Sequence, residues 1–111
     1  MKTLYKIYVG GNVEGKHCFG YLALVDHIKA ALYRSHIDNA TVLPAEGLYQ
    51  GKAEPSAVIE IIETPSVAVT RLQVLDVARQ LRATLRQEAI LVTAQELTEI
   101  VVVSAKAGGS I

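Results

Sequence analysis

A glycine-rich stretch near the N-terminus is the first residue pattern that could do chemistry. The segment GGNVEGKH, residues 10–17, follows the apolar run TLYKIYV and matches the G-x-x-x-x-G-K pattern of a phosphate-binding loop. Such a loop needs a Ser or Thr after the lysine as a magnesium ligand, and a helix that starts at the loop. Here His17 follows Lys16, and the next residues are CFG. The pattern therefore does not favour a nucleotide-hydrolysing loop, and we interpret it as a flexible connection between a strand and a helix.

The other reactive side chains in this part of the chain are a cysteine and three histidines. Metal binding by His17, Cys18, His27 and His36 is not favoured. The adjacent His17 and Cys18 do not easily converge with His27 and His36 on one metal ion, and no tight ligand spacing such as C-x-x-C or H-x-x-x-H occurs. Cys18 beside His17 could suggest a thiol nucleophile, but sequence neighbours usually point apart and no orienting Asp or Asn is identifiable. We expect a buried, unreactive thiol and no metal site.

The composition indicates one soluble domain. Of 111 residues, 50% are hydrophobic, and 11 basic and 11 acidic residues give a formal net charge of zero. This balance does not favour nucleic-acid or membrane-surface binding, and without Trp the chain lacks an obvious stacking platform for single-stranded nucleic acid. One Cys fits a reducing compartment and no apolar run reaches the ~20 residues of a membrane span, so we expect a cytoplasmic protein. We predict a single domain over residues 1–104 and a flexible tail, residues 105–111.

The first half of the chain predicts a strand, a helix and a long hairpin. Alternating apolar residues in TLYKIYV indicate a strand, and apolar residues at spacings of three and four from Tyr21 onward indicate an amphipathic helix that ends near SHIDN. The stretch ATVLPAEGLYQ then predicts a strand that Pro44 and Gly47 interrupt. The strand SAVIEIIE follows, so the two form a hairpin whose polar tip spans residues 51–55.

The second half predicts a helix and a β-rich segment. Pro65, with Thr64 or Ser66 as the cap, gives a helix-start signal. The apolar stripe of this helix consists of Val74, Val77, Ala78, Leu81 and Leu85. The basic edge beside the stripe consists of Arg71, Arg79, Arg82 and Arg86, which either bind an acidic partner or are solvated. The segment AILVTAQELTEIVVVS predicts one bent strand or two short ones.

The predicted order of elements is βαββαβ, an α+β fold of the ferredoxin-like type. It has an antiparallel sheet with two helices on one face, and the second part of the last segment could add a short C-terminal strand. In SAVIEIIE, however, Ile59 and Ile61 lie on one side, Val58 and Ile62 lie on the other, and all are apolar. Because a sheet with helices on one face should be polar on the other, we expect another copy of the chain to cover the second face. We therefore predict a homo-oligomer, a dimer or a larger assembly.

This topology brings three connections to one end of the fold. They carry six candidate ligand-binding side chains, Lys16, His17, Tyr49, Lys52, Glu54 and Arg86. Loops on a rigid scaffold commonly carry binding residues, so we predict a site for an anionic small molecule there. Tyr49 and Glu54 could serve as an acid and a base in a pocket, and ordinary surface charges are the alternative. No cofactor is predicted.

Two motifs carry a family resemblance. Residues 41–61 contain Ala-x-Gly-x-Tyr and then Glu-Pro-Ser before an apolar strand, and RQEAILVT, residues 86–93, contains Gln-Glu-Ala. In these motifs the chain resembles a small uncharacterised family of bacterial and phage proteins, in which a Gly stands at the position of Arg86. The resemblance implies a ferredoxin-like domain and brings no known activity or catalytic residues. In architecture alone, the chain also resembles the PII-like signalling proteins, which bind nucleotides between subunits beside a long hairpin loop.

Three hypotheses for function follow. The first is an oligomeric binding or regulatory module for an anionic small molecule or nucleotide, which would use Lys16, Lys52 and Arg86. The second is a protein–protein interaction or accessory protein of phage or mobile-element origin, which would use its apolar sheet face. The third is a small dimeric ferredoxin-like enzyme, of the isomerase or monooxygenase type, with Tyr49, Glu54 or His17 in its site. Of these, a binding module is favoured over an enzyme.

Overall fold

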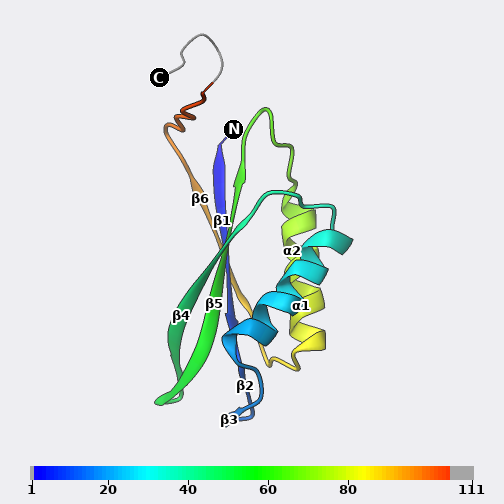
Figure 1. The fold of residues 1–111 in the computed structure, drawn as a ribbon, viewed down its shortest axis with the longest axis vertical. Helices are drawn as coiled ribbons and strands as arrows, with labels where there is room; N and C mark the ends of the chain where they lie inside the picture. Colours follow the sequence, from blue (N-terminus) through cyan, green and yellow to red (C-terminus); the bar gives the residue numbers. More distant parts are fainter. Residues whose placement is uncertain (1, 106–111) are drawn as a thin grey trace.

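The computed structural model describes residues 2–105 and consists of one sheet, two helices and a small separate hairpin (Figure 1). The larger elements are β1 (Thr3–Gly10), α1 (Tyr21–Arg34), β4 (Thr41–Tyr49), β5 (Lys52–Glu63), α2 (Arg71–Thr84) and β6 (Leu91–Glu96). The small hairpin consists of β2 (Asn12–Val13) and β3 (Lys16–His17). The main sheet has four antiparallel strands in the order β4-β5-β1-β6, which confirms the ferredoxin-like prediction. All but the first residue of the predicted tail, residues 105–111, lies outside the described residues.

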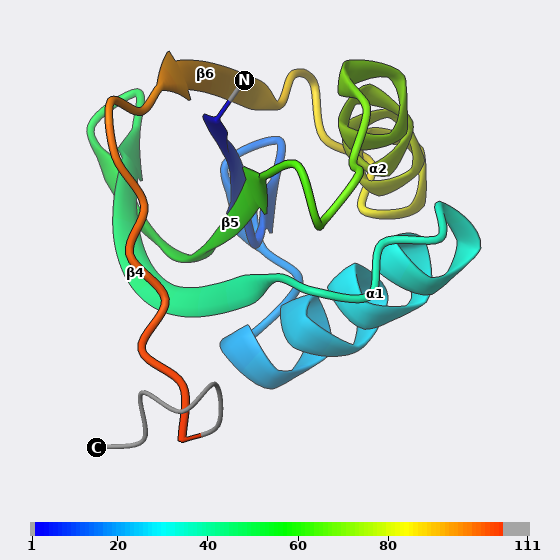
Figure 2. The same cartoon turned by 90° about the horizontal axis from the view of Figure 1, so that it is seen from above.

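Both helices lie on one face of the sheet, which we call the covered face (Figure 2). Its buried apolar strand residues are Tyr5, Ile7, Val9, Ala57, Ile59 and Ile61. The helix residues packed over them include Leu24, Ile28, Ala31 and Leu32 from α1, and Val74, Val77, Ala78 and Leu81 from α2, with Leu85 just beyond its end. The stripe predicted for α2 is confirmed. In α1 the spacing of four residues from Tyr21 predicts Val25 on the core side, but in the structure Leu24 is buried and Val25 is only partly buried.

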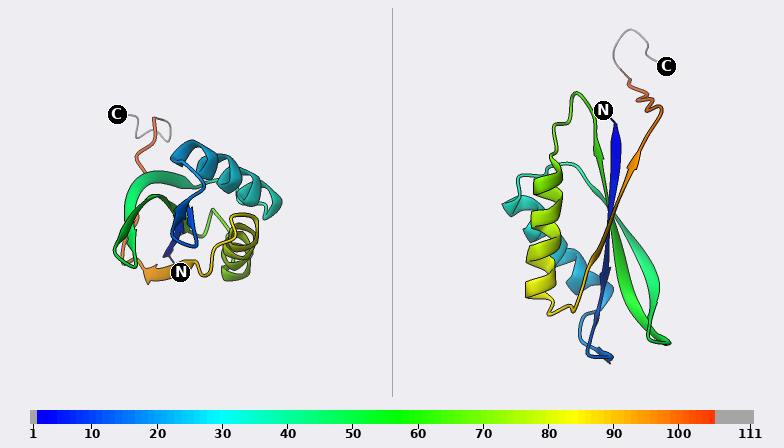
Figure 3. Two further views of the ribbon diagram at one scale, coloured as in Figure 1. Left: turned by 90° about the horizontal axis from the view of Figure 1, so that it is seen from below. Right: turned by 180° about the vertical axis from the view of Figure 1, so that it is seen from behind.

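The opposite face of the sheet, which we call the open face, carries no helix (Figure 3). Its apolar residues, which are exposed or partly exposed, are Leu4, Tyr8, Leu43, Val58, Ile62 and Leu91. Among them, Lys6 Nζ and Glu60 Oε2 form an ion pair at 3.8 Å. The sheet therefore has two apolar faces, and the chain's own helices cover only one of them.

The helix α2 begins later than the sequence signals indicate. Its cap is Thr70, whose side chain accepts a hydrogen bond from the Gln73 N–H at 3.2 Å while Gln73 Oε1 accepts from the Thr70 N–H at 2.9 Å. Thr64 instead closes a tight turn through a backbone bridge to Val67. The prediction of a cap at Thr64 or Ser66 was therefore wrong, because a reciprocal capping box outweighs a nearby proline.

The hairpin of β4 and β5 is longer and tighter than predicted. The pairing with β5 continues through Pro44 and Gly47, which lie in an edge strand, where a proline disrupts no inner ladder. The tip is the pair Gln50 and Gly51, with φ of 51° and 80°, the two positive values that a type I′ turn requires. The predicted tip at residues 51–55 was wrong, since Lys52 onward belongs to β5.

The glycine-rich stretch also forms a hairpin. Asn12 pairs with His17 and Val13 pairs with Lys16, around a turn in which Glu14 and Gly15 have φ of 50° and 77°. The predicted flexible connection is therefore an ordered pair of short strands. The β-rich C-terminal segment forms one strand, β6, and residues 97–105 are assigned to no helix or strand.

Candidate functional site

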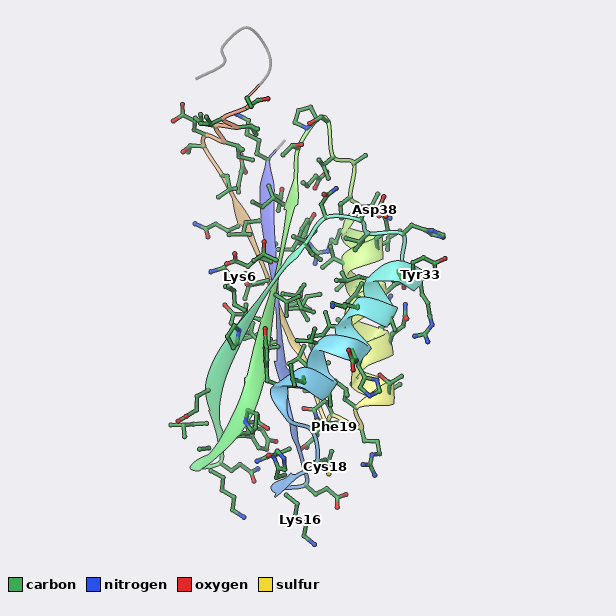
Figure 4. All side chains as sticks on the ribbon, in the orientation of Figure 1. Lys6, Lys16, Cys18, Phe19, Tyr33 and Asp38 are labelled. Carbon is green, nitrogen blue, oxygen red and sulfur yellow. The ribbon has the colours of Figure 1, made fainter. Side chains whose placement is uncertain are left out.

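Three connections meet at one end of the fold, which we call the hairpin end. They are the β2–β3 hairpin, the turn between β4 and β5, and the chain between α2 and β6 (Figure 1). Figure 4 shows Lys16 and Cys18 at this end and Asp38 at the other. The connections that carry the six candidate side chains thus lie at the same end of the molecule.

Glu54 is fixed at the hairpin end by a backbone hydrogen bond. The Asn12 N–H donates to Glu54 Oε2 at 2.9 Å, and Asn12 Nδ2 donates to the Ala53 carbonyl at 3.4 Å. The carboxylate lies against Gly10, where an added Cβ would come within 2.7 Å of Glu54 Oε2. Because Gly10 has no side chain, the Glu54 carboxylate can occupy the space beside it.

Tyr49 joins the tip of the long hairpin to the segment before β6. Its hydroxyl donates to Glu88 Oε2 at 2.9 Å. This hydrogen bond, followed by the negative charge of Glu88, raises the pKa of the Tyr49 phenol above its ordinary value, with smaller contributions from desolvation and from Glu54. A phenol with a raised pKa stays protonated at neutral pH, so Tyr49 is a hydrogen-bond donor in this site rather than a base.

The end of α2 is tied to the same region. Gln87 Nε2 donates to the Asn12 carbonyl at 3.0 Å. The preceding residue, Arg86, has φ of 53° and follows the helix in the left-handed cap conformation, with the Gln87 N–H bonded to the Arg82 carbonyl at 2.9 Å. Glycine is the usual residue in this conformation. This chain therefore places a cation at a position whose backbone conformation suits glycine.

Four of the six predicted side chains are cations or a histidine, namely Lys16, His17, Lys52 and Arg86. Lys52 Nζ lies beside the β2–β3 turn, 3.4 Å from the place where a Cβ on Gly15 would be. Lys16 and His17 are exposed on β3. Arg86 Nη2 is 3.9 Å from the sulfur of Cys18. Cys18 is exposed, so the expectation of a buried thiol was wrong.

A shallow hollow of about 330 Å³ lies on the long hairpin of β4 and β5. It is lined by Ala45, Glu46, Ala53, Glu54 and Pro55. Of these, only Glu54 was among the predicted site residues. The sequence analysis did not identify Asn12 or Glu46 as site residues. Asn12 holds Glu54 through its backbone N–H, which residue type does not reveal. Glu46 reaches the hollow only because the strands pair it with Pro55.

Other candidate residues lie elsewhere or have other partners. Arg79 pairs with Asp76 at 3.2 Å, and Arg71 lines a hollow of about 120 Å³ beside α2 and β6. His27 contacts the edge of Phe19, with 5.6 Å between ring centroids. Within residues 2–105, no three His, Cys, Asp or Glu side chains are grouped so that they could hold a metal. Neither helix in that range is long and apolar enough to cross a membrane.

Solved structures of phage proteins share this fold. A phage SAM (S-adenosylmethionine) lyase in its apo state is 26% identical, with a TM-score of 0.72 over 85% of this chain and 79% of that chain. A phage SAM lyase in complex with S-methyl-5′-thioadenosine is 25% identical, with a TM-score of 0.71 over 86% of this chain and 81% of that chain. The designed protein Foldit4 is 14% identical, with a TM-score of 0.52 over 87% of this chain and 99% of that chain, and shares the fold alone. The sequence matches no protein-family model and no curated protein.

Proposed function

We propose that this chain binds adenosine derivatives with sulfur at the 5′ position and cleaves S-adenosylmethionine to S-methyl-5′-thioadenosine. The observation that carries the proposal is the similarity to phage SAM lyase, which extends over 85% and 86% of this chain in the two structures. One of those structures holds S-methyl-5′-thioadenosine. The hairpin end, with its hollow and its Tyr49–Glu88 pair, is the region of this chain that we assign to the ligand.

The charge of the hairpin end supports a ligand with a positive sulfur. Two acidic residues, Glu46 and Glu54, are among the residues that line the hollow, and an acidic lining attracts the sulfonium of S-adenosylmethionine and repels a phosphate. The substrate also carries an α-carboxylate, for which Lys52 on β5 and Arg86 after α2, two cations of the hairpin end, are suitable partners. The proposed ligand, which carries positive as well as negative charge, thus replaces the anionic small molecule or nucleotide of the sequence-based hypothesis.

The proposed cleavage breaks the bond between sulfur and the four-carbon amino-acid arm. The electron pair of that bond moves to sulfur, so the sulfonium becomes the neutral thioether S-methyl-5′-thioadenosine. The four-carbon fragment either gives up a proton from the carbon next to the broken bond, which water accepts, or forms a bond from its own carboxylate oxygen to the carbon that sulfur leaves. Because the positive charge on sulfur disappears in this step, carboxylates beside it stabilise the bound substrate more than the transition state. We therefore assign Glu54 to binding and orientation.

The oligomer belongs to the same proposal. A hollow formed by residues of two adjacent strands leaves most of a nucleoside exposed, whereas small-molecule sites bury most of their ligand. The open face supplies an apolar surface beyond the hairpin end on which another copy could lie. We propose that the chain acts as a homo-oligomer assembled through this face.

The test is incubation of the purified protein with S-adenosylmethionine, followed by chromatography for S-methyl-5′-thioadenosine. We expect product from the parent protein and at least about tenfold lower kcat/KM for Glu54→Gln and for Tyr49→Phe, since each change removes a charged partner or a hydrogen bond. The matched control is Asp38→Asn, an exposed acid at the opposite end of the molecule, which should keep parental kcat/KM. Circular dichroism of each variant checks that it is folded.

A thermal-shift measurement with S-methyl-5′-thioadenosine separates binding from cleavage. A shift without product would support the regulatory binding module and overturn the lyase. Absence of both a shift and product from folded protein would overturn the whole proposal. In that case the interaction or accessory protein of phage origin becomes the preferred function, since the similar lyases are phage proteins and the open face is apolar.

A further inference from the structure

The segment after β6 is apolar and exposed. Val101, Val102 and Val103 are exposed to 72%, 81% and 74% of their surface. We call residues 98–104 the arm. Its sequence, TEIVVVS, is rich in β-branched residues, which favour extended conformations. Three adjacent exposed valines are an unusual surface for a folded protein and indicate a contact that one copy alone does not make.

The arm has a fixed starting point. The Leu97 N–H donates to the Lys2 carbonyl at 2.8 Å, so the arm begins beside the residue that precedes β1. From there the chain runs past the end of the sheet, on the side away from the helices (Figures 1 and 2). The arm therefore emerges on the same side as the open face, and the two apolar surfaces can meet one partner together.

We propose that the arm of one copy packs across the open face of a second copy. This inference rests on the homo-oligomer of the proposed function and specifies its contact. Each chain supplies one apolar arm and one apolar face, so two copies are complementary without any other protein. In the middle of the open face, Lys6 and Glu60 are paired with each other, so this part of the surface offers no net charge to an acidic or basic partner.

The dimensions fit this arrangement. An extended segment of seven residues spans roughly 23 Å, at about 3.3 Å per residue. Four strands spaced about 4.8 Å apart are roughly 14 Å wide between the outer two. The arm is thus long enough to cross all four strands of a neighbouring sheet, and its valines can replace water over the middle row, which contains Tyr8, Leu43, Val58 and Leu91.

The first test is sedimentation velocity of the parent protein and of two single variants. Val102→Glu places a charge on the arm, and Leu43→Glu places one on the open face; Leu91→Glu is a second face variant in case Leu43→Glu is unfolded by circular dichroism. We expect the parent to associate and each variant to raise the dissociation constant at least about a hundredfold, because an unpaired charge would be buried in the contact. The matched control is Leu72→Glu on α2, which is 69% exposed on the helix side and should associate like the parent.

Mixing the two variants tests the contact itself. Val102→Glu has an intact face and Leu43→Glu has an intact arm, so an equal mixture should associate more tightly than either variant alone. Failure of the mixture to associate would overturn the contact between arm and face. If face variants dissociate while Val102→Glu assembles like the parent, the arm has no role and the oligomer through the open face stands. A parent protein that stays monomeric overturns both, and the cleavage assay is read independently of all these outcomes.

Discussion

The two faces of the sheet have nearly the same residue types and opposite surroundings. On β5, Ile61 is fully buried under the helices, and the next residue, Ile62, is 42% exposed on the open face. Earlier on the same strand, Ile59 is fully buried under the helices and Val58 is partly exposed on the open face. Side-chain alternation thus places apolar residues on both sides of the strand, and the chain's own helices decide which side becomes core. The remaining apolar side is available for contacts between molecules.

The adjacent isoleucines give the largest expected contrast. We expect Ile61→Ala to lower the free energy of unfolding by about 2–5 kcal/mol, because it leaves a cavity in a close-packed core. The same change at Ile62 should cost about 1 kcal/mol or less in the monomer, since much of that side chain already contacts water. Urea unfolding at low protein concentration measures both.

Protein concentration should affect the Ile61→Ala and Ile62→Ala variants differently. Raising the protein concentration should increase the cost of Ile62→Ala and leave that of Ile61→Ala unchanged, if copies associate through the open face. Equal losses at low concentration would show that the two faces are equally buried, contrary to the structure. A cost at Ile62 that never changes with concentration would count against the oligomer.

The sequence predicts the covered face better than the ends of the elements. The stripe of α2 follows from residue spacing alone, and so does the pairing of two apolar strands. The start of α2 does not follow, because Pro65 gives a local start signal that the reciprocal bonds of Thr70 and Gln73 outweigh. The tip of the long hairpin was misplaced for a similar reason, since polar residues after Gly51 suggest a loop although they pair across the strands.

Loss of the N-terminal cap of α2 should destabilise the protein less than Ile61→Ala does. Thr70→Ala should lower the free energy of unfolding by about 1 kcal/mol, because the N–H of Gln73 loses its acceptor. Ser66→Ala, the control at the position favoured by the sequence signal, should change it by less than about 0.5 kcal/mol. Thermal unfolding of both variants measures the difference. A larger loss at Ser66 than at Thr70 would contradict the helix start seen in the structure.

The candidate site was predictable only in part. The topology alone brings the connections carrying Tyr49, Lys52 and Glu54 to one end, as the sequence analysis expected. The partners that fix them were harder to identify, because Asn12 contributes a backbone N–H and Gly10 contributes only space. No residue-type pattern marks either contribution. Contacts of this kind depend on how strands end and turn, which periodicity does not describe.

Two tyrosines offer the finest comparison between the covered face and the hairpin end. The pKa of each phenol is raised above its ordinary value of 10.0. For Tyr5 the largest cause is burial, followed by the hydrogen bond to Glu63. For Tyr49 the largest cause is the hydrogen bond to Glu88. A raised pKa means that the fold favours the protonated phenol. Each contribution to stability is therefore complete below pH 10 and is lost as the pH rises through the pKa of the folded state.

Salt should separate these two causes. Screening weakens the effect of the Glu88 charge on the exposed Tyr49, so its pKa should fall toward 10.0 at high salt, whereas the Tyr5 pKa should change little because salt does not reverse burial. Ultraviolet titration of phenolate in the parent, Tyr5→Phe and Tyr49→Phe, at low and high salt, assigns each transition. Equal salt shifts for both phenols would mean that Tyr5, too, is governed by a nearby charge. The covered face would then be more accessible to ions at its edge than the packing around Tyr5 indicates.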